Sequence, residues 1–143
     1  ECLTVLTFLV DALSAKSGSI KKFLIIINMA FKMKSPFRLD LLTTSMFERD
    51  MEGDPVHART PKSGVIILNK DSKDPHEKLN TVIHELEHVR QYKAGELDYG
   101  TNGAGKEIVL WKGKEYPYSD MASGDPTKPW EIKPYKLEKK LNT

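Results

Sequence analysis

The segment from residue 75 to about residue 94 constrains the fold of this 143-residue chain more than any other feature. Asp74 is a good N-cap, Pro75 suits the first helical position, and Glu77 stands where the glutamate of a capping box belongs. Gly95 follows the last turn, where glycine commonly ends a helix. The sequence therefore predicts one long helix over about 75–94.

The two sides of this predicted helix differ in chemistry. A rotation of about 100° per residue places His84 and His88 about 40° apart, with about 6 Å between them along the axis. The opposite side is almost entirely apolar, with Leu79, Val82, Ile83, Leu86, Val89 and Lys93. We therefore expect the apolar side to pack on the core and the two histidines to lie away from it.

The stretch HELEH, residues 84–88, has the spacing of a metal-binding helix. Two neutral imidazoles one turn apart can bind one zinc ion at about 2.0–2.1 Å each. Glu85 lies beside them but off their line, so it can reach a zinc-bound water and take its proton without binding the metal. The alternative is a surface helix that has this residue pattern by chance. The predicted strand before the helix and the helix cap favour the metal site.

A catalytic zinc site normally has three protein ligands and one open position. No histidine follows His88, and His76 lies about 12 Å along the helix from His84, too far to share an ion. The third ligand is therefore His57 or a downstream carboxylate. The downstream carboxylates are Glu96, Asp98, Glu107, Glu115, Asp120, Asp125, Glu131 and Glu138.

Among these carboxylates we select Glu131. It begins the second predicted helical segment, and Pro129 and Pro134 restrict the backbone on both sides of it. Asp98, in a predicted glycine-rich loop, is the main rival. Glu138 stands among lysines and is expected to be solvated.

The stretch HELEH resembles the H-E-x-x-H helix of zincin metallopeptidases, and a downstream glutamate ligand makes the chain similar to their gluzincin branch. The stretches "GVIILN", "WKGKEY" and "PWEIKPY" are similar to those of small metallopeptidases of phages and bacteria. The resemblance covers most of residues 62–137. It implies an α+β, zincin-like single domain with a small sheet, an active-site helix at about 75–94 and a C-terminal helix.

The resemblance also implies roles for single residues. His84, His88 and Glu131 would bind one Zn²⁺ ion, with Glu85 as general base and proton shuttle. The substrate would be a peptide or protein, bound by β-augmentation along the strand 65–69. The alternative function is that of a zincin-fold structural or interaction protein, such as a phage component, which binds metal but cleaves little.

The resemblance does not mark a transition-state-stabilising residue. Tyr116, Tyr118 and Tyr135 are the candidates, with packing or exposure on the hairpin as the alternative for each. Gln91 either supports one of the metal-binding histidines or is solvated. Pro134 interrupts the helix that carries the glutamate in larger gluzincins, which leaves the presentation of Glu131 open.

The remaining segments have simpler patterns. Residues 65–69 read as a strand and residues 107–118 as a hairpin with Lys112-Gly113 at its turn. Residues 52–64 read as a loop, and residues 37–51 fit either a strand or a helix. The last helix is expected from about Pro134. Trp111 and Trp130 are expected in the core rather than in a substrate site.

Composition excludes several classes of partner. The net charge of +2, with basic and acidic residues interspersed, gives no reason to expect nucleic acid. No apolar run is long enough to span a bilayer, and neither "LTVLTFLV" nor "IKKFLIIINMAF" has the full pattern of a signal peptide. The single cysteine, Cys2, excludes an internal disulfide framework. We expect a cytoplasmic or virion-associated protein without a membrane partner.

Residues 1–28 differ from the rest in having little polar patterning. Met29 begins a stretch that resembles an ordinary N-terminus. We therefore expect residues 29–143 to form the domain and residues 1–28 to be upstream translated sequence or a leader. The alternative is a genuine N-terminal helix from Leu3 to Ala15 that packs on the domain.

Overall fold

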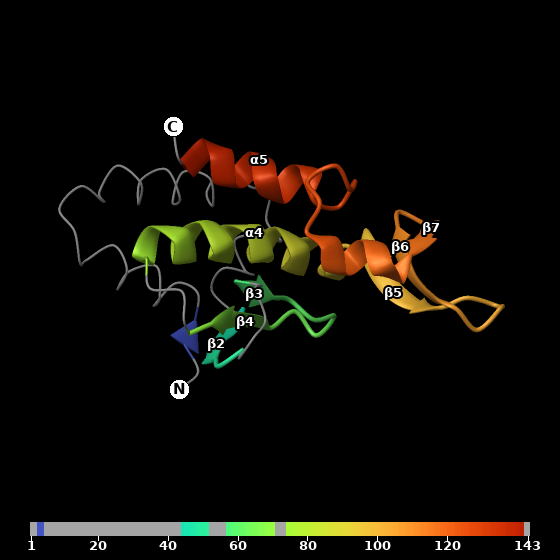
Figure 1. The fold of residues 1–143 in the computed structure, drawn as a ribbon, viewed down its shortest axis with the longest axis horizontal. Coiled ribbons are helices and arrows are strands. Elements are labelled where there is room, and N and C mark those ends of the chain that lie inside the picture. Colours follow the sequence, from blue (N-terminus) through green and yellow to red (C-terminus); the bar gives the residue numbers. More distant parts are fainter. Residues whose placement is uncertain (1–2, 5–43, 52–56, 71–73, 142–143) are drawn as a thin grey trace.

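The structure is a computed structural model, and it describes residues 3–4, 44–51, 57–70 and 74–141 (Figure 1). Within this part of the chain, two small sheets and two α-helices form an α+β fold, which confirms the expected class. In chain order the elements are β1 (Leu3–Thr4), β2 (Ser45–Arg49), β3 (Ala58–Arg59), β4 (Ile66–Asn69), α4 (Pro75–Lys93), β5 (Leu97–Thr101), β6 (Glu107–Trp111), β7 (Lys114–Pro117), the 3-10 helix η1 (Tyr118–Ser123) and α5 (Ile132–Leu141).

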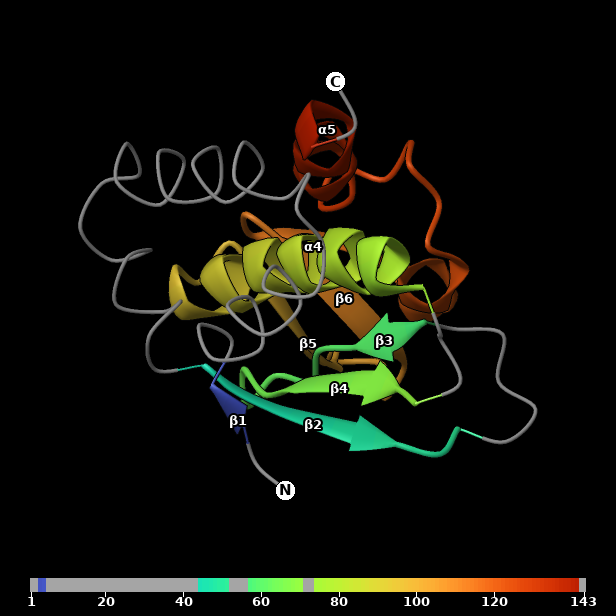
Figure 2. The same cartoon turned by 90° about the vertical axis from the view of Figure 1, so that its left-hand side faces the viewer.

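Helix α4 runs through the middle of the molecule, as predicted from residue 75 onward. The first sheet lies on one side of it and α5 on the other, while β5–β7 lie near its C-terminal end (Figures 1 and 2). At that end, Glu96 N–H donates to the carbonyl of Gln91 (2.9 Å) and Gly95 N–H to that of Tyr92 (3.0 Å). Gly95 has φ +66°, so these two bonds form the expected glycine-dependent end of the helix.

Both sides of α4 are buried. The predicted apolar residues Leu79, Val82, Ile83, Leu86 and Val89 are in the core, as expected. The opposite side, which carries the histidines, is covered by α5, so that Glu87 and Gln91 are fully buried and His88 is 8% exposed. Polar groups on this side therefore need partners from α5 or from the segment before it.

The first sheet has the strand order β1-β2-β4-β3, with β2 and β4 parallel and the other pairs antiparallel. The predicted strand at 65–69 exists as β4, but β2 and β3 occupy both of its edges. The expectation that β4 binds an extended peptide is therefore wrong. Ala58 and Arg59, in the segment predicted to be loop, form the edge strand β3, and Asn69 N–H also donates to the carbonyl of His57 (2.9 Å).

The second sheet is an antiparallel meander, β5-β6-β7. The predicted hairpin is confirmed, and Lys112 (φ 49°) and Gly113 (φ 82°) have the two positive φ angles that a type I′ turn requires. Asp98 was expected in a loop, but it lies in β5, because residues 97–101 pair with residues 107–111 along the whole of β6.

The second sheet packs on a small core of Leu97, Val109 and Trp130. Trp130 is fully buried, and Trp111 packs against this cluster from its margin, so the expectation of core positions holds for Trp130 and in part for Trp111. This arrangement fixes the chain immediately before Glu131.

Several expectations for the N-terminal part fall outside the described residues. Leu3 and Thr4 form β1 and pair with Met46 and Ser45, so a helix does not begin at Leu3. The rest of that predicted helix and the proposed boundary at Met29 lie in residues that the structure does not describe. Within the ambiguous segment 37–51, residues 45–49 are a strand. None of the described helices is long and apolar enough to cross a membrane.

Candidate metal centre

A cavity of about 610 Å³ opens between α4, the segment around β3, η1 and α5. His84, Glu85 and His88 reach it from α4, and Glu131 reaches it from the residue directly before α5. The histidines are thus presented by one helix and the glutamate by the start of another, which lies against the first (Figure 1). Among the described residues, His84, His88 and Glu131 are the group whose ligand atoms could converge on one metal ion.

The distances within this group fit a small tetrahedral ion. Nε2 of His84 and Nε2 of His88 are 3.1 Å apart. Glu131 Oε2 lies 3.0 Å from Nε2 of His84, and Oε1 lies 3.5 Å from Nε2 of His88. Ligands that bind a tetrahedral zinc at 2.0–2.1 Å are about 3.3 Å apart, so the three donors lie at the separation that zinc requires.

The surroundings of Glu131 Oε2 also favour a cation at this position. Although Glu131 Oε2 is close to His84, it is buried and receives no well-directed hydrogen bond from the described residues. A buried carboxylate oxygen without a hydrogen bond is costly unless another positive group satisfies it. A cation between Glu131 and the two histidines would satisfy it.

Gln91 fixes the orientation of His88. Its amide nitrogen donates to the carbonyl oxygen of Trp130 (2.7 Å), which can only accept, so the amide oxygen must face Nδ1 of His88 at 2.9 Å. Nδ1 is therefore the donor, and Nε2 presents its lone pair to the cluster when the ring is neutral. The sequence leaves two roles open for Gln91, and the structure gives the first: Gln91 is buried and supports a histidine, and it is not solvated.

Glu138 does the same for His84. Its Oε1 lies 2.7 Å from Nδ1 of His84, and its side chain is 25% exposed, so the expectation of a solvated residue is wrong. Glu138 stands seven residues after Glu131, and two helical turns place both on the side of α5 that faces α4. Pro134 does not interrupt this helix, because α5 begins at Ile132 and a proline in the first turn removes no intrahelical hydrogen bond.

The electrostatics favour positive charge at the cluster. Burial by itself lowers the pKa of His84, but the carboxylates of Glu131 and Glu138 outweigh it and raise this pKa to about 10. Burial likewise opposes a rise in the pKa of His88, which Glu131 nevertheless raises. For Glu131, burial raises the pKa, but the two histidines outweigh it and lower the pKa to about 2. The carboxylate is therefore ionised and available to a cation.

Glu85 is buried on α4 and lines the same cavity. It is outside the three-residue cluster, yet its negative charge contributes to the raised pKa values of both histidines. The hydroxyl of Thr60, just after β3, donates to its Oε2 (2.5 Å). This contact ties the carboxylate to the segment after β3, in the same cavity as the cluster, a position suited to a group that would exchange protons with a bound water.

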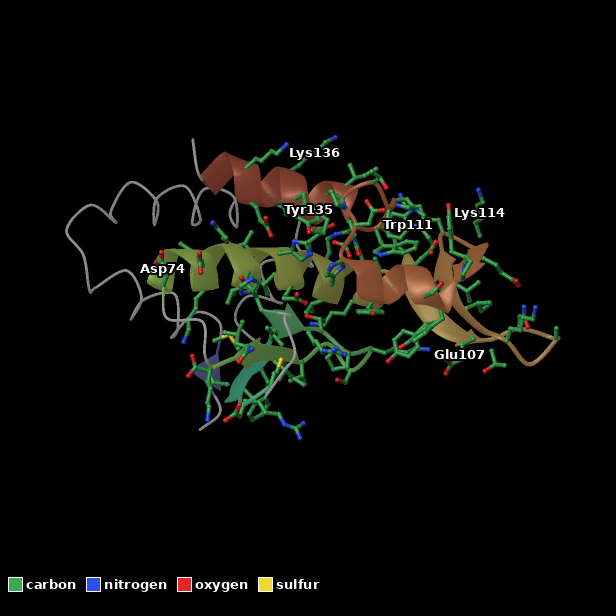
Figure 3. All side chains as sticks on the ribbon, in the orientation of Figure 1. Asp74, Glu107, Trp111, Lys114, Tyr135 and Lys136 are labelled. Atoms are coloured by element: carbon green, nitrogen blue, oxygen red, sulfur yellow. The ribbon has the colours of Figure 1, made fainter. Side chains whose placement is uncertain are left out.

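The structure separates the three candidate tyrosines. Tyr118 and Tyr135 line the cavity, whereas Tyr116 does not and packs edge-on against Trp130, with ring centroids 5.3 Å apart. Tyr135 lies between α5 and α4 (Figure 3), and its ring is 5.0 Å from that of His84. Its hydroxyl donates to the carbonyl oxygen of Gly124 (2.7 Å).

Neither His57 nor Asp98, the rival candidates for the third ligand, joins the cluster. His57 lines the cavity but is not part of the cluster, and Asp98 forms an ion pair with Lys62. Sequence reasoning missed Glu138 and Thr60 as supports of the site. The seven-residue spacing from Glu131 was a usable signal for Glu138, but no local pattern marks Thr60, which depends on the placement of β3.

Comparison of the chain with models of protein families, with curated proteins and with solved structures gives no match. The function of the chain is therefore inferred from the chemistry of this site.

Proposed function

We propose that this chain is a zinc-dependent metallopeptidase with a zincin-like, gluzincin-type arrangement, in which His84, His88 and Glu131 hold one zinc ion. The observation that carries the proposal is the convergence of these three donors, 3.0–3.5 Å apart, beside the buried carboxylate of Glu85. Two histidines and one glutamate with an open position are a typical catalytic zinc ligand set. When bound, zinc supplies an activated water and a Lewis acid for the scissile carbonyl.

The protein's own residues then have separate tasks. Gln91 and Glu138 hold the Nδ1 atoms of His88 and His84, so that both Nε2 atoms face the metal position. Glu85 takes the proton of the attacking water and delivers it to the leaving amine, and Thr60 keeps its carboxylate in place. Tyr118 and Tyr135, which line the cavity, stay candidates for contacts with the developing oxyanion, while Tyr116 packs against Trp130 and does not line the cavity.

The substrate is a peptide in an extended conformation. Among the described residues, β3 is the edge strand of the first sheet, and Ala58 and Arg59 line the cavity. A substrate main chain that lies along β3 would bring a peptide bond past Glu85 and the metal ligands.

Replacing Glu85 with glutamine tests the catalytic proposal. The amide keeps the shape of the side chain but cannot accept the proton, so E85Q should bind one zinc per chain and cleave no peptide. The matched control is E107Q, an exposed glutamate on β6 far from Tyr135 in Figure 3, which should keep both zinc and cleavage. A wild-type protein that binds zinc and cleaves nothing in a diverse peptide library would favour a structural or interaction role instead.

A further inference from the structure

One end of the cavity is lined by aromatic side chains. Tyr92 lies on α4 four residues after His88, and Tyr99 on β5, Tyr118 on η1 and Met121 on η1 complete this end. We call these four residues the tyrosine pocket. Since Tyr92 is one helical turn beyond a proposed metal ligand, the tyrosine pocket adjoins the metal centre.

The rings of the tyrosine pocket are set for contact with another aromatic ring. Tyr92 and Tyr99 have centroids 6.2 Å apart at an interplanar angle of 82°, and Tyr99 and Tyr118 have centroids 6.1 Å apart at 65°. Rings at these separations already contact one another, and all three line the cavity, so a further aromatic ring that enters the cavity can pack against them in the same manner. Met121 adds a thioether, which also contacts aromatic rings favourably.

One polar atom in the tyrosine pocket lacks a partner. The hydroxyl oxygen of Tyr92 is buried and has no hydrogen-bond partner among the described residues. Burial raises the pKa of this hydroxyl, with further contributions from Tyr99 and Glu85, so it keeps its proton and can donate. A buried hydroxyl without a partner is costly in the free protein, and a ligand that displaces the side chains covering it and supplies an acceptor removes this cost.

We propose that the tyrosine pocket binds an aromatic side chain of the peptide substrate, and prefers tyrosine to phenylalanine because Tyr92 donates a hydrogen bond to its phenol oxygen. The identification of the occupant as part of a peptide rests on the proposed function. Phenylalanine would pack on the same rings but leave the Tyr92 hydroxyl unpaired. Alanine would neither pack on the rings nor accept the hydrogen bond.

Binding can be measured without cleavage. The probes are the N-acetyl amides of tyrosine, phenylalanine and alanine, titrated by NMR into E85Q with and without zinc. We expect the affinity order tyrosine, phenylalanine, alanine, with tyrosine about 3- to 10-fold above phenylalanine, the range of one neutral hydrogen bond. Equal affinity for the three amides, or no saturable binding of any of them, would overturn the proposal.

Y92F removes the hydroxyl and keeps the ring. It should abolish the preference for the tyrosine amide, leave the phenylalanine amide bound at least as well, and melt no lower than its parent, because the lost hydroxyl has no partner. T101V, which removes a hydroxyl from the exposed end of β5, is the control and should keep the preference. A preference that survives Y92F would contradict the role of Tyr92.

The two proposals can fail separately. If the wild type cleaves no peptide but the tyrosine amide binds and Y92F abolishes its preference, the peptidase proposal fails and the tyrosine pocket stands. If the wild type cleaves peptides that differ only in tyrosine, phenylalanine or alanine at equal rates, the tyrosine pocket fails and the peptidase stands.

Discussion

The side-chain oxygen of Gln91 lies 2.9 Å from Nδ1 of His88, on the side of the ring away from Glu131. The amide nitrogen of Gln91 donates to the carbonyl oxygen of Trp130, the residue before Glu131. A single buried side chain therefore orients one proposed ligand and fixes the backbone next to another. The proposed metal centre depends on this link between α4 and the start of α5.

Replacing Gln91 tests the two halves of the link separately. Q91E keeps an acceptor for His88 Nδ1 but places a carboxylate oxygen against the carbonyl of Trp130, so it should lower stability more than zinc affinity. Q91L removes both bonds and should weaken zinc binding about 10- to 100-fold, the usual effect of losing such a support. Competition with a chelator measures the affinity and thermal melting measures the stability. Equal zinc affinity of Q91L and wild type would contradict the orienting role.

Glu138 should support His84 in the same way. E138A removes the acceptor of His84 Nδ1 and should weaken zinc binding about 10- to 100-fold, while E138Q keeps an acceptor oxygen and should lose less. K136A on the same helix is the control, since Lys136 is exposed and points away from α4 (Figure 3). Metal titration of the three variants would reject the role if E138A and K136A bound zinc alike.

Glu96 gives a prediction for acid stability. The hydrogen bond from Arg90 lowers the pKa of Glu96 below 4.5, against a smaller opposing effect of burial. Its folded pKa is thus below the unfolded one, so its stabilisation is fully present above about pH 4.5 and is lost as pH falls through the folded pKa. E96Q should be less stable than wild type at pH 7 by about 0.2–1 kcal/mol, and the difference should vanish in acid. Denaturant unfolding across this pH range would contradict the prediction if the difference were constant.

The hairpin turn is expected to matter for stability and not for the site. Gly113 has φ 82°, which a residue with Cβ adopts only at a cost, so G113A should lower the free energy of unfolding by about 1 kcal/mol. Zinc affinity should stay at the wild-type value, because neither Lys112 nor Gly113 lines the cavity. A loss of zinc binding in folded G113A would show that the second sheet is coupled to the metal centre.

Helix α4 and the β6–β7 hairpin could be predicted because their signals are local. Pro75 and Gly95 mark the ends of α4, and its apolar spacing marks the core side. Lys112-Gly113 marks the hairpin turn. These residues specify their structure through backbone preferences and neighbours a few positions away, which a single sequence contains.

The errors concern contacts between distant segments. β3 has only two residues, and its pairing with β4 depends on a partner that local propensity does not reveal. Glu138 has the sequence context of a solvated residue, and only the packing of α5 on α4 brings it to His84. Glu131 was selected from sequence by its flanking prolines, whereas its place beside the histidines results from the burial of Trp130 and the start of α5 at Ile132.

The central claim is that His84, His88 and Glu131 form one zinc site, and zinc content measures it most directly. The wild type, loaded with zinc and dialysed, should retain one ion per chain. E131Q, checked for its fold by circular dichroism, should retain far less under the same dialysis, while the control E107Q should match the wild type. Wild-type protein without bound zinc, or folded E131Q that holds zinc as tightly as the wild type, would contradict the claim.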